Sequence, residues 1–113
     1  MAQAAADTDI RIEPAWKVSI VYGMPCAIYH QLLAAYYFAA RFQDDFESAV
    51  LHAVNGGGQN QARAILTGAL VGAQTGFSGI PQRFLDGLAD LDTLKSLAIA
   101  IASQVDSTAD TID

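Results

Sequence analysis

The residues that decide the fold are 45–58, which read DFESAVLHAVNGGG. Apolar side chains recur there at i, i+3, i+4, i+7 and i+8, the spacing of one face of a helix: Phe46, Ala49, Val50, Ala53 and Val54. Asp44 or Asp45 can cap the N-terminus of this helix. The run from Asn55 to Gly58 tolerates the positive φ angles that often end a helix, so it predicts a tight connector.

A second helix is expected directly after this connector, from Asn60 to about Thr75. One of its faces is apolar and is formed by Ile65, Leu66, Ala69, Leu70 and Ala73. Another face carries small residues at a spacing of four, which are Ala64, Gly68, Gly72 and Gly76. Because small residues leave a shallow groove, another helix is expected to pack closely against this face.

Further helices are predicted on both sides, so the chain is assigned to the all-α class as a compact bundle of about five helices. One helix runs from Pro25 to about Arg41, and apolar residues on nearly every face predict that it is central and buried. Pro81 opens a short helix to about Leu88. Asp90 or Asp92 begins the last helix, which keeps a 3.6-residue period up to Val105.

The domain organisation follows from where apolar periodicity begins and ends. Residues 1–13 are small, polar and acidic without a period, so they are expected to form a flexible N-terminal tail. Residues 14–105 are expected to form a single helical domain, and residues 106–113 an acidic C-terminal tail. Within the domain, residues 15–24 alternate imperfectly, and a strand and a short helix both remain open there.

Composition excludes several classes of protein. The chain has twelve acidic and six basic residues and a net charge of −6, which disfavours nucleic acid as a partner. No apolar run approaches the roughly 20 residues of a membrane span. A single cysteine, Cys26, and the lack of a signal sequence indicate the cytoplasm. The 52% hydrophobic content against 16% charged residues predicts that part of the surface meets another chain, as in a homodimer.

The order of these elements resembles the ADP-ribosylglycohydrolase family, which includes J1-crystallin-like proteins. The resemblance is carried by residues 45–58, by the run GALVGA at 68–73 and by Ile80-Pro81, and it covers roughly residues 30–90. In that family an acidic helix leads into a Gly-Gly-Asp-Thr-Asp-Thr type motif, a Gly/Ala-rich helix and an Ile-Pro turn. The resemblance implies an all-α fold that matches the C-terminal part of the family, here as a truncated, free-standing fragment.

The same resemblance implies a degenerate active site. The family hydrolyses ADP-ribosyl bonds with paired magnesium ions, which its Asp-Thr-Asp-Thr residues help to hold. This sequence has Gln59-Asn60-Gln61-Ala62 at that place, with amides instead of carboxylates. Since magnesium prefers anionic oxygen, we expect no metal site, no magnesium cofactor and no catalytic residue.

Glycines that precede a helix N-terminus expose backbone N–H groups and can receive a diphosphate. By itself the pattern favours a plain connector over a ligand site. More distant branches of the family have Gly-Gly-Asp-Asn-x-x-Arg here, which Asn60 and Arg63 resemble. The candidate ligand-binding residues are therefore Gly57, Gly58, Gln59, Asn60 and Arg63.

Two hypotheses for function follow. The favoured one is a non-catalytic binding or assembly module that self-associates, because the metal ligands are missing and apolar residues are in excess. The alternative is a binder of ADP-ribose or a similar nucleotide, or a residual ADP-ribosyl hydrolase, with a site completed by a second chain. Enzyme activity is left open, with the missing carboxylates against it.

Overall fold

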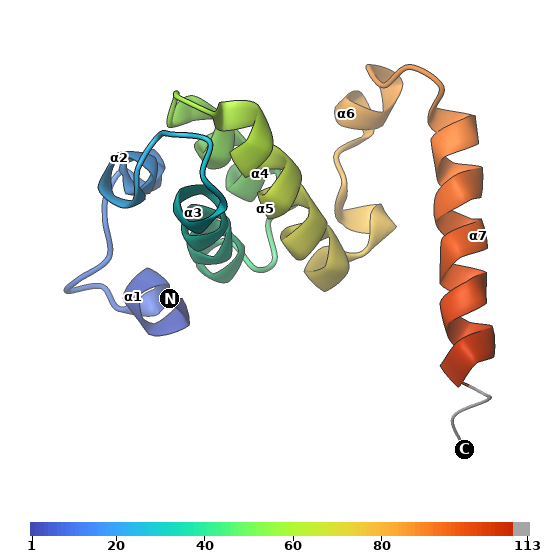
Figure 1. The fold of residues 1–113 in the computed structure, drawn as a ribbon, viewed down its shortest axis with the longest axis horizontal. Helices are drawn as coiled ribbons and strands as arrows, with labels where there is room; N and C mark the ends of the chain where they lie inside the picture. Colours follow the sequence, from blue (N-terminus) through green and yellow to red (C-terminus); the bar gives the residue numbers. More distant parts are fainter. Residues whose placement is uncertain (110–113) are drawn as a thin grey trace. The chain divides into compact units, whose positions relative to one another are not determined.

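The computed structural model describes residues 1–109, and every regular element in that range is helical (Figure 1). The elements are α1 (Ala2–Ala6), the 3-10 helix η1 (Ala15–Lys17), α2 (Val18–Tyr22), α3 (Ile28–Arg41), α4 (Phe46–Asn55), α5 (Asn60–Thr75), the 3-10 helix η2 (Phe77–Gly79), α6 (Gln82–Asp86) and α7 (Leu91–Ala109). The predicted all-α class is confirmed. The five predicted helices correspond to α3–α7, whereas α1 and α2 are additional. The segment 15–24, for which a strand and a short helix were both open, forms η1 and α2 and contains no strand.

The chain divides into two units, Met1–Pro81 and Gln82–Asp113, where a single helical domain was expected for residues 14–105. The break falls at Pro81, where a proline that cannot continue the preceding structure opens the short helix α6. Each unit therefore has to be considered by itself.

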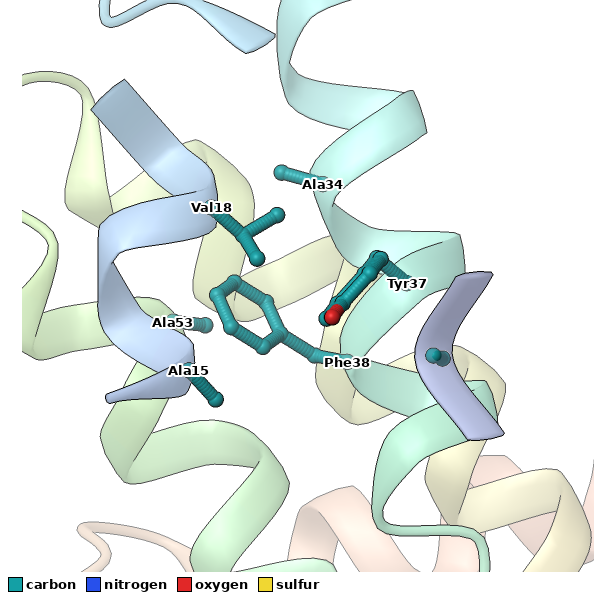
Figure 2. Packing of buried hydrophobic residues seen from close by; sticks show 7 residues of the cluster. Ala15, Val18, Ala34, Tyr37, Phe38 and Ala53 are labelled. Atoms are coloured by element: carbon teal, nitrogen blue, oxygen red, sulfur yellow. The ribbon is translucent and has the colours of Figure 1, made fainter. Parts of the chain in front are cut away.

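Helix α3 is the centre of the first unit, where it packs against α1, α2, α4 and α5. Figure 2 shows the fully buried ring of Phe38 facing Ala15 of η1, Val18 of α2 and Ala53 of α4. Full burial of such an aromatic side chain contributes about 2–3 kcal/mol of hydrophobic stabilisation. The side chain of Phe38 thus joins the continuous η1–α2 segment to α4, which lies far from it in the sequence, and α3 has the central position expected for it.

Residues 1–13 are tied to this core, in contrast to the loose tail expected from their composition. Ala5 of α1 is fully buried, and α1 packs against α3. The hydroxyl of Tyr37 accepts a hydrogen bond from the backbone N–H of Ile12 at 3.0 Å. A five-residue alanine-rich helix is too short to show an apolar period, so the sequence pattern could not predict that α1 packs against the core.

Helix α4 packs along the small-residue face of α5. A Cβ atom added at Gly68 would lie 3.8 Å from Val50, and one added at Gly72 would lie 3.6 Å from Phe46. Both glycines therefore face α4, and the lack of side chains lets the two backbones approach as the spacing predicted. This helix pair carries the glycine connector at one end (Figure 1).

The second unit contains α6 and α7, and none of residues 82–106 is buried. Helix α7 continues through Ala109, so it includes the start of the acidic tail expected for residues 106–113, while residues 110–113 lie outside the described range. Its large apolar side chains are exposed to solvent by 47–63%: Leu94, Leu97, Ile99, Ile101 and Val105. Even so, no helix in residues 1–109 combines the length and apolar character that crossing a bilayer demands.

Candidate functional site

The connector between α4 and α5, residues 56–59, is the candidate site and is called the glycine loop below. Gly57 and Gly58 have φ angles of 72° and 61°, in the left-handed region that glycine adopts without steric cost. A Cβ atom at Gly58 would lie 2.6 Å from the Cβ atom of Met24. The loop therefore needs glycine both for its backbone conformation and for its close approach to the segment that precedes α3.

Arg63 lies beneath the glycine loop and is fully buried. Its Nη1 atom donates hydrogen bonds to the carbonyl oxygens of Ala53 at 2.8 Å and Gly57 at 2.9 Å, and Nη2 donates to Gly57 at 2.7 Å. These carbonyls lie at the C-terminal end of α4, where the helix dipole favours a positive charge. Burial lowers the pKa of the Arg63 guanidinium from its usual value, and an arginine still stays protonated near neutral pH. Arg63 thus holds the loop against α4 from inside the fold.

A second set of hydrogen bonds ties the loop to the segment between α2 and α3. The backbone N–H of Gln59 donates to the carbonyl oxygen of Met24 at 3.2 Å. Gln31, which is buried in α3, donates from Nε2 to Pro25 at 2.5 Å and to Met24 at 3.3 Å. A buried amide needs such partners, so Gln31 fixes the segment on which the loop rests. The sequence did not predict Met24 and Gln31 as part of the site. The one available signal was the amide of Gln31, a polar side chain within a largely apolar helix.

The structure brings the five predicted ligand-binding residues together, but their exposure differs. Gly58 and Gln59 are exposed, Gly57 and Asn60 are half-buried, and Arg63 is in the interior. Helix α5 begins after Gln59 without a hydrogen bond from a capping side chain, which leaves the N–H groups of its first turn without a side-chain acceptor. The groups that face solvent here are therefore backbone and amide groups.

The magnesium ions that the resemblance implies are usually held by one or two carboxylates together with water. Gln59, Asn60 and Gln61 supply neutral amides at this place. Across residues 1–109, moreover, no group of three or more His, Cys, Asp or Glu side chains is arranged to hold a metal ion. Residues 56–61 therefore offer no carboxylate, the ligand by which proteins usually hold magnesium, and do not fit that ion.

Comparison with known proteins shows which family the chain belongs to. Over 62 residues the chain is 45% identical to an uncharacterized protein of Archaeoglobus fulgidus, a match that covers 55% of this chain and 19% of that protein. The chain thus spans only a small part of this relative's length. No solved structure matches the chain. The family model for ADP-ribosylglycohydrolase matches residues 1–110, well beyond the 30–90 that carry the resemblance in sequence, and the chain belongs to the ADP-ribosylglycohydrolase family.

Proposed function

We propose that this chain is a non-catalytic binding or assembly module of the ADP-ribosylglycohydrolase family that self-associates, most simply as a homodimer. The observation that carries the proposal is the open surface of α7, where the large apolar side chains between Leu94 and Val105 are 47–63% exposed. A two-helix unit that has no buried residue between positions 82 and 106 gains too little from its own contacts there to offset the entropy lost on ordering. A second chain that covers α7 would supply the missing burial.

The glycine loop supports a non-catalytic role. Hydrolysis by a metal-activated water needs a bound ion, and neutral amides hold hard cations weakly. The proposal therefore takes the loop as a connector that Arg63 fastens to α4, in a module that needs no magnesium. It also takes the chain as the counterpart of the C-terminal part of the family's fold, at work in the cytoplasm.

Sedimentation equilibrium of the full chain over a range of micromolar concentrations tests the proposal. The expected result is a mass that rises with concentration from that of one chain to that of two. The same measurement in high salt should change the equilibrium little, because apolar contacts dominate. A mass that stays at one chain at every concentration contradicts self-association.

A second candidate function is the binding of ADP-ribose or a similar nucleotide at the glycine loop. It is favoured by the exposure of Gly58 and Gln59 beside the uncapped N-terminus of α5, because such N–H groups attract a diphosphate. In this alternative Gly57, Gly58, Gln59 and Asn60 contact the ligand and Arg63 positions the loop. A residual hydrolase with a pocket completed by a second chain belongs to the same alternative.

Calorimetric titration with ADP-ribose, with and without magnesium, tests this second candidate. Binding that does not depend on magnesium is expected, and Asn60→Ala should weaken it several-fold. Gln61→Ala, in the same helical turn and exposed, is the matched control and should leave the affinity unchanged. The absence of any binding heat would remove the nucleotide candidate, whereas binding only with magnesium would favour the hydrolase.

A further inference from the structure

We infer that α7 is covered by α7 of a second copy of this chain, and that the two helices pair antiparallel about a twofold axis. This inference rests on the self-association proposed above and names its surface. Alternating spacings of three and four define a stripe, called the α7 stripe below: Leu91, Leu94, Ala98, Ile101 and Val105. Such heptad spacing is typical of a helix that packs along another helix.

The α7 stripe is complementary to itself in the antiparallel direction. Its layers place Leu94 opposite Val105 of the second copy, and Ala98 opposite Ile101 of the second copy. Each layer then combines a larger with a smaller side chain, which lets the two helices interdigitate at normal packing density. The 19 residues of α7 span about 28 Å, so the layers can form along most of the helix.

The charges beside the stripe select the antiparallel arrangement. Lys95 and Asp106 are eleven residues apart, about three helical turns, so they lie on the same flank of α7 near opposite ends. Reversing the second helix in this register brings Lys95 of each copy within two residues, about 3 Å along the axis, of the level of Asp106 of the other. The long lysine side chain can span this distance, which gives two ion pairs. A parallel pair would instead bring Lys95 level with Lys95 and Asp106 level with Asp106. The cation also lies near the C-terminal end of the partner helix, where the dipole favours it.

Two matched variants test whether the stripe is the interface. Ile101 and Ile99 are 63% and 58% exposed, and they lie about 200° apart around the helix. Ile101→Glu places a charge within the stripe and should raise the dissociation constant of the dimer about a hundredfold, since that charge is buried without a partner. Ile99→Glu places the same charge on the opposite face and should change the constant less than about threefold. Far-ultraviolet circular dichroism of both variants should match that of the parent chain.

The outcomes separate this inference from the function on which it rests. A parent chain that stays monomeric contradicts self-association itself. A dimer that forms equally well in the parent and in both variants leaves self-association standing but overturns the assignment to α7. Equal weakening by Ile99→Glu and Ile101→Glu overturns the assignment to the stripe.

Charge exchange tests the direction of the helices. Lys95→Asp and Asp106→Lys should each weaken the dimer several-fold, because each creates two repulsive pairs across the twofold axis. The double variant restores opposite charges and should regain the affinity of the parent chain. A double variant as weak as the two single variants combined overturns the antiparallel arrangement.

Discussion

Helices α5 and α7 are both long and rich in alanine and leucine, yet only α5 is covered by helices of its own unit. Helix α5 buries Arg63, Thr67 and Val71, whereas no residue of α7 up to Asp106 is buried. The spacing of apolar residues predicts a helix in both cases, but it places the apolar contact face of α5 wrongly. Ile65 is 64% exposed, and Ala69 and Ala73 are exposed as well, because the residues that turn inward are Arg63, Thr67 and Val71.

The face of small residues is predicted correctly, since Gly68 and Gly72 lie against α4. What the spacing does not predict is where the partner of that face comes from. For α5 the partner is α4 of the same unit. The glycines of α5 carry no side chain, so the two helices can pack closely.

The largest expected effect compares the core of the first unit with the surface of α7. Phe38→Ala should lower the free energy of unfolding by about 3–5 kcal/mol, because it leaves a cavity among three elements. Ile99→Ala, at a 58% exposed position outside the stripe, should lower it by less than about 1 kcal/mol. Urea denaturation followed by circular dichroism measures both. Similar costs for the two variants would mean that α7 is as well covered as α3.

An intermediate effect is expected from the small residues of the two helices. Gly68→Leu should destabilise the chain by about 1–3 kcal/mol, because its side chain must displace Val50 of α4. Gly68→Ala adds only a Cβ atom at ordinary contact distance and should stabilise the helix by up to about 1 kcal/mol. Ala100→Leu on the exposed surface of α7 is the control. Thermal unfolding measures the stability of the three variants. A Gly68→Leu variant as stable as the parent would argue against close packing of α4 on α5.

The smallest effect concerns the N-cap of α4, for which Asp44 and Asp45 were both candidates from the sequence. The structure assigns it to Asp45, since its carboxylate accepts hydrogen bonds from the Ser48 hydroxyl at 2.6 Å and the Ser48 backbone N–H at 3.0 Å. These two bonds, the hydroxyl first, lower the pKa of the Asp45 carboxyl. A carboxyl with a lowered pKa in the folded state stabilises the protein above its unfolded pKa, and this contribution is lost as pH falls through the folded pKa.

Asp45→Ala should therefore cost about 1 kcal/mol near neutral pH. The difference from the parent chain should shrink as the solution is acidified, since the parent loses the charged cap. Urea midpoints at neutral and acidic pH measure this, with Asp44→Ala as the control. A difference that is the same at both pH values would show that the charge of Asp45 contributes nothing to the cap.

The sequence predicted α4, α5 and the glycine loop because each has a local signal: an apolar period, a capping residue or a run of glycines. It did not predict the orientation of Arg63. An arginine three residues after Asn60 has the same spacing whether its guanidinium meets a ligand or turns back to the carbonyls of α4. The guanidinium takes the second course, and the loop beside it packs against Met24, a contact between segments far apart in the chain that no local pattern records.

The hydrogen bond from Gln59 to Met24 has a consequence for how the first unit opens. The Gln59 amide is exchangeable with solvent deuterium only when the segment before α3 separates from the glycine loop. If the amide exchanges as slowly as those of the α3 core, the N-terminal helices and the α4–α5 pair unfold as one cooperative body. If it exchanges much faster, the loop is released while both helices persist. Exchange at this single amide thus measures how much of the first unit must unfold before the candidate site becomes free.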